Sequence, residues 1–470
     1  MALIDASRAF GARFEIARAE ELLEKLVREA GDRPGILVHA GQSYRMIFRP
    51  DKAIECFQRA LAIKRDLPEA LLELAVLYER RHRLSEAQAS VEECLRSAPD
   101  YLEAALIKAR LLRRSRDDAG SENILRALAA NEQAHPMVRS QAWADIAQLL
   151  DRNADYEGAM SAMLKSKELL LPGEAQFKKE SDTVVEILRR IAHEATQDTF
   201  QKWSQEARGL PARKVAVLAS FPRSGTTLLE QVLDSHPGLV SSDERENFAR
   251  DIFPAMWAGL TNREPTLALM GSVPISRLAS LREKYLSSMA SALNEPIGDR
   301  VHLDKNPSLT LMIPAFLRLF PEGRLIIALR DPRDVILSCF MQFLPLNTNS
   351  VCFLSLERAA TRYAVDMGVW LQLRDKLSAN WLEVRYEDAI ENLEKEARRG
   401  LGFLGLDWDA SVMGYRKRVA QKAVSSPTYE AVSKPLYKSS IGRWHHYERH
   451  FAPVLEKLKP FARAFGYESP

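Results

Sequence analysis

The chain has 470 residues, of which 46% are apolar and 27% are charged, and its formal net charge is +3. This length exceeds one ordinary hydrophobic core and predicts two or three domains, with a composition typical of soluble globular proteins. The near-neutral charge gives no general preference for nucleic acid or membranes, so any anion must be recognised by a local site.

The first residues, Met1–Phe10, contain an early acid and no continuous apolar stretch, so they predict no signal peptide. No run approaches the ~18–20 apolar residues that a membrane span requires. Four cysteines lie far apart without a C-x-x-C pair, as is typical of a reducing compartment: Cys56, Cys94, Cys339 and Cys352. We therefore expect a cytoplasmic protein without a nucleic-acid or membrane partner, and the sequence leaves the oligomeric state open.

The first third of the chain repeats a pattern with a period of about 34 residues. Small and large residues keep the same offsets in three windows, which begin near Leu37, Leu71 and Trp143. The small residues let two antiparallel helices approach closely, and the large ones fill the gap between neighbouring pairs. The pattern resembles that of tetratricopeptide repeats and predicts an all-α array over residues 1–172.

Two further segments extend this array. The window Leu102–His135 is a degenerate repeat, and a half repeat that acts as an N-terminal cap is expected around Ala19, Leu23 and Leu26. About four units result, more than the three or so that such stacks need. The concave face of the array either binds an acceptor or a partner protein, or serves as a scaffold or dimerisation surface, and the sequence leaves both readings open.

A helical cap and connector is predicted over residues 173–211. The pattern of apolar and polar residues changes after it. The remaining domain, 212–470, alternates amphipathic helices with short apolar runs at Val215–Ala219, Arg324–Leu329 and Trp381–Tyr386. This alternation predicts an α/β fold with a parallel sheet. Ligands of such sheets bind at the carboxyl ends of the strands.

A candidate anion-binding loop follows the first of these strands. The segment Phe221–Leu228 reads F-P-R-S-G-T-T-L and leads into a helix. Backbone N–H groups and the positive end of a helix dipole converge on one anion in such a turn. The ATPase version has a lysine directly after its second glycine. Here Thr226 follows Gly225, and the cation is Arg223 on the other side of the glycine, so the loop fits a phosphate or sulfate in a different manner.

Five blocks in order, within residues 214–445, resemble sulfotransferases, most closely the tyrosylprotein sulfotransferase branch. The blocks are Arg223–Leu228 followed by Asp234–Pro237 and Glu244, then Asp304–Pro307, Leu325–Ser338, Arg385–Asp388 and Lys434–Trp444. A tetratricopeptide array joined to such a domain resembles a known bacterial arrangement. The resemblance implies a P-loop-like sulfotransferase domain and a PAPS-dependent enzyme, where PAPS is 3′-phosphoadenosine 5′-phosphosulfate.

The resemblance implies PAPS as the sulfuryl donor and 3′-phosphoadenosine 5′-phosphate as the product. No metal is expected, because a sulfuryl group carries less charge than a nucleotide γ-phosphate and the sequence shows no clear metal-ligand cluster. Its 5′-phosphosulfate would meet the loop after the first strand, and its 3′-phosphate would meet Arg330 and Ser338. The donor-binding residues carried over in this way are Arg223, Ser224, Gly225, Thr226, Thr227, Arg330, Ser338, Tyr386 and Arg443.

The resemblance also implies catalytic roles. Glu244 would accept the proton of the acceptor hydroxyl, and Arg223 and Lys305 would stabilise charge that develops on the bridging oxygen. Thr428 would supply a hydroxyl near the C-terminus, where the family has a serine. Ser425 and Ser426 compete with it for this role.

Neighbouring residues leave alternatives to these assignments. Asp243 and Glu246 flank the predicted base, and His302 is a second-ranked base because small-molecule sulfotransferases use a histidine near a lysine. Arg333 is a further candidate for the 3′-phosphate site.

The leading hypothesis is sulfuryl transfer to an acceptor hydroxyl, with a protein or peptide tyrosine as one acceptor and glycan, lipid or small-molecule hydroxyls as others. The alternative is an inactive sulfotransferase-like scaffold or binding protein that carries the repeat array. A P-loop kinase is disfavoured because no lysine follows Gly225 and no magnesium-binding aspartate follows a second strand.

Overall fold

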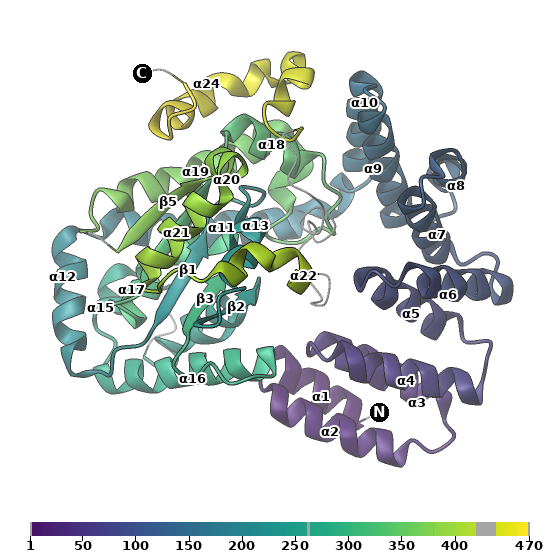
Figure 1. Cartoon of the computed structure of the whole chain (residues 1–470), viewed down its shortest axis with the longest axis horizontal. Helices are drawn as coiled ribbons and strands as arrows, with labels where there is room; N and C mark the ends of the chain where they lie inside the picture. The colour runs from purple at the N-terminus through teal and green to yellow at the C-terminus, as the bar shows by residue number, and fades with distance from the viewer. Residues whose placement is uncertain (1, 261–263, 379, 420–438, 469–470) are drawn as a thin grey trace. The chain divides into compact units, whose positions relative to one another are not determined.

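The structure is a computed structural model that describes residues 2–260, 264–378, 380–419 and 439–468 (Figure 1). The chain divides into two compact units. The helical unit consists of Met1–Leu169 with Ser287–Pro296, and the sheet unit consists of Leu170–Leu286 with Ile297–Pro470. The connector predicted over 173–211 therefore lies within the sheet unit.

The helical unit is built from antiparallel helix pairs. The helices are α1 (Ala2–Ala12), α2 (Ile16–Glu29), α3 (Pro34–Met46), α4 (Pro50–Ile63), α5 (Pro68–Arg80), α6 (Leu84–Ser97), α7 (Leu102–Arg114), α8 (Asp118–Ala130), α9 (Pro136–Arg152) and α10 (Tyr156–Glu168). The first helices of four successive pairs, α3, α5, α7 and α9, begin at intervals of 34 residues. Several of these helices begin with proline, which is favoured at the first helical position because its missing N–H would have no partner there.

The turn inside each helix pair repeats as regularly as the helices. Phe14, Phe48, His82 and Arg116, each 34 residues after the last, all have a left-handed backbone, with φ between 57° and 67°. The degenerate window that contains Arg116 therefore keeps the turn, although its side chains depart from the pattern. At the N-terminus the structure differs from the expected half repeat, because α1 packs on α2 as a complete pair with Ile4 fully buried.

A glycine sets the close approach of α3 and α4. A Cβ atom at Gly41 would lie 2.6 Å from the ring of Phe57, which has no exposed surface. Real Cβ atoms do not tolerate such a distance, so the aromatic ring occupies the space that the glycine leaves. The small residue thus lets the two helices of this pair approach closely.

The sheet unit contains one five-stranded sheet. Its strands are β1 (Val215–Ala219), β2 (Leu239–Asp243), β3 (Val301–Lys305), β4 (Arg324–Leu329) and β5 (Trp381–Arg385). The strand order is β2-β3-β1-β4-β5, and every pair is parallel. The predicted α/β domain with a parallel sheet is thus confirmed, and two strands, β2 and β3, lie outside the predicted runs.

Helices surround this sheet. They are α11 (Glu174–Glu194), α12 (Gln197–Glu206), α13 (Thr226–Leu233), α14 (Phe253–Ala255), α15 (Leu267–Gly271), α16 (Ile275–Leu293), α17 (Ile313–Leu319), α18 (Pro332–Phe340), α19 (Leu356–Arg374), α20 (Tyr386–Glu391), α21 (Leu393–Leu404), α22 (Tyr415–Val419) and α24 (Glu448–Ala464). Side chains of β1, α13 and α21 form one buried cluster, which includes Leu218, Val232 and Leu401.

The strand order creates a switch point at the carboxyl end of β1. This strand lies between β3 and β4, and the chain passes first to the β2–β3 side and then crosses to the β4–β5 side. Neighbouring connections diverge at such a switch point and leave a crevice at the carboxyl ends of the strands, where α/β proteins bind ligands.

We expect Gly41→Ala to lower the free energy of unfolding of the helical unit by about 1–3 kcal/mol, because the added methyl overpacks the contact with Phe57. Gly35→Ala is the matched control in the same helix, since a Cβ there meets nothing within 4 Å. Its stability should be unchanged or slightly raised. Urea unfolding of the full chain, followed by the helical circular-dichroism signal, compares the two, and equal losses would contradict the close approach.

Candidate active site

Side-chain contacts of Ser220, Ser224 and Tyr386 fix the backbone shape of the loop after β1. Ser220 Oγ donates to the Ala328 carbonyl of β4 (2.5 Å), and Ser224 Oγ donates to the Phe221 carbonyl (2.8 Å). Gly225 has φ +93°, and a Cβ there would lie 2.5 Å from Cδ2 of Tyr386. Only glycine therefore fits between the start of α13 and this aromatic ring.

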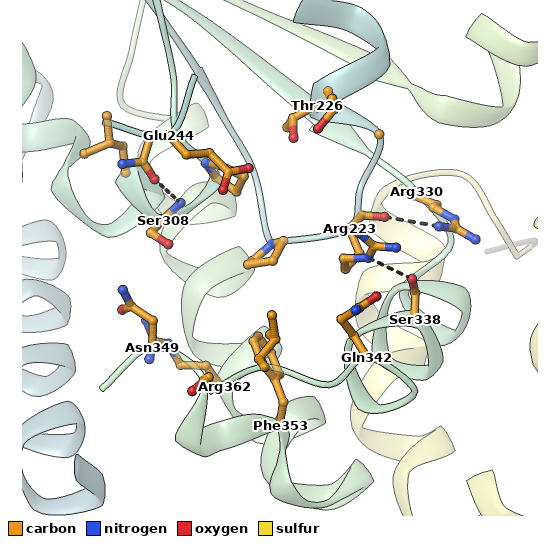
Figure 2. Close-up of a pocket in the computed structure, with 18 of the residues that line it drawn as sticks. Arg223, Thr226, Glu244, Ser308, Arg330, Ser338, Gln342, Asn349, Phe353 and Arg362 are labelled. Carbon is orange, nitrogen blue, oxygen red and sulfur yellow. Dashed lines mark hydrogen bonds between the residues drawn. The ribbon is translucent and has the colours of Figure 1, made fainter. Parts of the chain in front are cut away.

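Arg223 joins the loop to the segment after β4. Its Nε donates to Ser338 Oγ of α18 (3.0 Å), and its carbonyl accepts from Arg330 Nη1 (3.2 Å) (Figure 2). Its backbone is left-handed, with φ +72°. Two hydrogen bonds to one segment hold this unfavourable conformation and direct the guanidinium across the loop. Arg223 thus contacts both residues that the resemblance assigns to the 3′-phosphate.

Arg330 also contacts the C-terminal part of the chain. Its Nη2 donates to the Ser440 carbonyl (2.5 Å), and its guanidinium lies 5.0 Å from the ring centroid of Tyr386. The Tyr386 hydroxyl lies 3.0 Å from Ser440 Oγ. Among the described residues, Arg330 Nε has no hydrogen-bond partner. This buried donor is thus available to an anion that enters the site.

A buried carboxylate holds the segment that carries Arg443. Asp334 of α18 accepts from the backbone N–H groups of Gly442 (2.6 Å) and Trp444 (2.9 Å). Arg443, which lies between them at the start of η7 (Arg443–Tyr447), lines the same cavity as Arg223 and Arg330. Arg333 is engaged elsewhere, in ion pairs with Asp331 and Glu468 (2.7 Å each), and it does not line the cavity.

Lys305, at the end of β3, lies among three carboxylates. Its Nζ is 2.5 Å from Asp243 Oδ1, 2.8 Å from Glu244 Oε1 and 3.7 Å from Glu230 Oε2, and its side chain has no exposed surface. Burial alone would lower the pKa of Lys305, but the three carboxylates outweigh burial and raise it above its usual value. The ammonium is therefore charged at neutral pH, and it reaches the cavity only through Glu244.

Glu244 is the carboxylate of this cluster that faces the cavity. Its backbone N–H donates to the Lys305 carbonyl (2.8 Å), and its side chain is 36% exposed. A left-handed backbone, with φ +51°, turns it out of the strand direction directly after β2. The side chain of Asp243 stays buried against Lys305 and does not line the cavity.

The other candidate bases lie in different surroundings. Glu246 lines the cavity but forms an exposed ion pair with Arg250 (3.2 Å). His302 is fully buried beside Ser242 Oγ (3.1 Å), away from the cavity, and burial lowers the pKa of its imidazole to about 4. This histidine is therefore a neutral core residue at neutral pH, without access to an acceptor.

The cavity has a volume of about 520 Å³. Figure 2 shows Glu244 and Ser308 at one end, Arg330 and Ser338 at the other, and Arg223 between them. The predicted site residues that line it are Arg223, Gly225, Thr226, Thr227, Glu244, Arg330, Ser338, Tyr386 and Arg443. Ser224 and Lys305 lie behind this surface, and Thr428, Ser425 and Ser426 lie outside the described residues.

The sequence patterns do not reveal Ser440, nor the apolar residues of α11 that line the cavity, Val184, Val185 and Leu188. Ser440 lies far from the loop in sequence, and contacts with Asp334, Arg330 and Tyr386 bring its segment to the cavity. No short motif marks such a residue. Among the described residues, no three His, Cys, Asp or Glu side chains gather as a metal site requires, and no helix combines the length and apolarity needed to cross a bilayer.

Comparisons with known proteins match this part of the chain. The model of a family described as the sulfotransferase family matches residues 216–410. Protein-tyrosine sulfotransferase 2 of Gallus gallus is 23% identical over 274 residues, which cover 54% of this chain and 71% of that protein. Protein-tyrosine sulfotransferase A of Caenorhabditis elegans is 24% identical over 264 residues, which cover 53% and 66%.

An uncharacterized protein of Aquifex aeolicus is 25% identical over 316 residues, which cover 66% of this chain and only 40% of that protein. The sulfotransferase domain of an olefin synthase from Synechococcus PCC 7002 is 20% identical and covers 56% of this chain and 98% of its own, with a TM-score of 0.40, on which no conclusion rests. Residues 216–410 thus match the model of the sulfotransferase family, and the chain is similar to protein-tyrosine sulfotransferases over about half of its length.

Proposed function

We propose that this protein transfers a sulfuryl group from PAPS to an acceptor hydroxyl, with Glu244 as the general base. One observation supports this proposal most strongly. The cationic loop residue Arg223 and the carboxylate Glu244, which is itself hydrogen bonded to Lys305, line one cavity at the switch point of the sheet. An inactive scaffold has no need for this convergence.

The residues at the Arg330 end fit the 3′-phosphate of such a donor. Arg330 Nε is a buried donor without a partner among the described residues. Ser338 Oγ accepts from Arg223, so its own hydrogen can be donated to a phosphate oxygen. Charge-assisted hydrogen bonds of this kind are about twice as strong as neutral ones. Arg443 adds a further cation to the same cavity.

The loop residues fit the phosphosulfate end. The absence of a Cβ at Gly225 leaves room under the Tyr386 ring, and the loop leads directly into the N-terminus of α13 at Thr226. Such a helix start is a ready anion-binding site. Bound there, PAPS would supply an activated sulfuryl group and a phosphate leaving group.

Glu244 is suited to accept the proton of the acceptor. Lys305 holds one of its oxygens at 2.8 Å, while the carboxylate remains exposed toward the cavity. Because this lysine stays protonated, its ion pair with the neighbouring carboxylate holds that carboxylate in one orientation. Arg223 lies between Glu244 and the Arg330 end, where negative charge would develop on the leaving oxygen, and stabilises it there. The tyrosine hydroxyl, on which the named relatives act, is one acceptor of this class.

We expect Glu244→Gln to lower kcat by about 10²–10⁴-fold while donor affinity is retained, because the amide keeps the shape but does not accept the proton. Glu246→Gln is the matched control, since Glu246 lines the same cavity but pairs with Arg250. Its kcat should be unchanged. Transfer of ³⁵S from labelled PAPS gives the rates, and calorimetry with the product nucleotide gives the affinity. A Glu246 variant that loses the rate while the Glu244 variant keeps it would reverse the assignment.

We expect Gly225→Ala to weaken donor binding by about tenfold or more, because the methyl would clash with Tyr386 and the left-handed backbone would be strained. Gly402→Ala in α21 is the control, since a Cβ there meets nothing within 4 Å. Calorimetry with 3′-phosphoadenosine 5′-phosphate measures both variants. Wild-type affinity in Gly225→Ala would show that the loop does not hold the nucleotide.

A further inference from the structure

We infer that the acceptor is an uncharged hydroxyl compound with an apolar body, an aryl or alkyl alcohol, which packs on aliphatic side chains beside Glu244. This inference rests on the proposed sulfuryl transfer and specifies its second substrate. It follows from the residues that line the cavity at the Glu244 end.

The chain geometry places η4 (Pro307–Met312) at this end. The Lys305 carbonyl accepts from Glu244 N–H, and Asn306 Nδ2 donates to the Arg245 carbonyl (3.2 Å). Since η4 begins directly after Asn306, its residues lie next to the candidate base. Figure 2 shows Ser308 beside Glu244, away from Arg330 and Ser338.

Aliphatic side chains from two elements form what we call the acceptor wall. Helix α11 packs against η4. The wall residues that line the cavity are Val184, Val185 and Leu188 of α11 and Leu309, Leu311 and Met312 of η4. Val184 is 48% exposed, so the wall continues to the mouth of the cavity as open apolar surface. Covering such surface stabilises a complex by about 25 cal/mol per Å² removed from water.

The loop that follows α18 adds neutral groups to the lining of the same cavity. Leu344, Pro345 and the amides Asn347 and Asn349 line the cavity. The Asn347 side-chain oxygen accepts from the backbone N–H groups of Asn349 (2.8 Å) and Ser350 (3.0 Å), which holds the loop in one shape. The polar atoms on this side are uncharged, and the surface is formed before any acceptor arrives.

The charges of the cavity disfavour an acidic acceptor. Among the described lining residues the cations are Arg223, Arg330, Arg443 and Arg362. The first three belong to the proposed donor site, and Arg362 is paired with Asp366 (2.7 Å). Glu244 shares the single ammonium of Lys305 with Glu230 and Asp243, so negative charge remains at the acceptor end, whereas Glu246 is paired with Arg250 (3.2 Å). A peptide with acidic residues around its tyrosine would meet like charge there, which is costly at a partly buried site.

The test compares three acceptors with the full-length protein and ³⁵S-labelled PAPS: 2-naphthol, a peptide with tyrosine among alanines, and the same peptide with aspartates around the tyrosine. We expect kcat/KM for 2-naphthol and for the neutral peptide to exceed that for the acidic peptide by about tenfold or more. Equal rates, or a preference for the acidic peptide, would overturn the inference.

A charge placed on the wall gives a second readout. In Val184→Lys, kcat/KM for the acidic peptide should rise and that for 2-naphthol should fall, because a cation replaces exposed apolar surface. Thr183→Lys is the matched control, because it adds the same charge to the neighbouring, exposed position of α11, outside the cavity lining. Equal effects of the two variants would contradict a contact between Val184 and the acceptor.

Calorimetry with the product nucleotide separates the two proposals. If the nucleotide binds but neither 2-naphthol nor the neutral peptide is labelled, the acceptor inference is overturned and the donor site stands. If the nucleotide does not bind, the proposed function itself fails.

Discussion

One buried ammonium group organises the chemical end of the sheet. Lys305 has no contact with solvent, and a charge in that position is costly unless opposite charges surround it. Glu230, Asp243 and Glu244 provide those charges from α13 and from the end of β2. The reverse holds as well, because three carboxylates so close together would repel one another without the lysine. The position of Glu244 at the cavity is thus a result of charge balance as much as of backbone direction.

The same cluster explains which strands were visible in the sequence. β1 and β4 are apolar runs because their side chains face hydrophobic layers, and the sequence pattern predicts them. β2 ends in two serines and an aspartate, and β3 contains His302, Asp304 and Lys305, all fully buried. Their polar side chains bond with one another across the sheet, so a search for apolar runs passes over them. The polar residues that link β2 and β3 to the candidate site are thus the ones that prevent their recognition as apolar strands.

Motif spacing predicted the members of the candidate site better than it predicted their exposure. The spacing from Arg223 brings Glu244 to the cavity, and the Arg330–Ser338 spacing places both residues against Arg223. Spacing cannot distinguish a cavity-lining lysine from one that lies behind a carboxylate, as Lys305 does. It also cannot reveal the α11 wall or Ser440, because these reach the cavity through contacts between distant parts of the chain. In the helical unit the period was readable, whereas the recurring left-handed turn, carried by three different residue types, has no sequence signature.

The left-handed backbone of Arg223 links two loops that are distant in the sequence. That conformation costs about 1–2 kcal/mol for a residue other than glycine. The Ser338 hydroxyl and the Arg330 guanidinium, both from the segment that follows β4, make the hydrogen bonds that offset this cost. The loop after β1 would relax if either partner were lost. The loop after β1 and the segment after β4, which together form the proposed donor site, are therefore one cooperative element that acquires its shape as a whole.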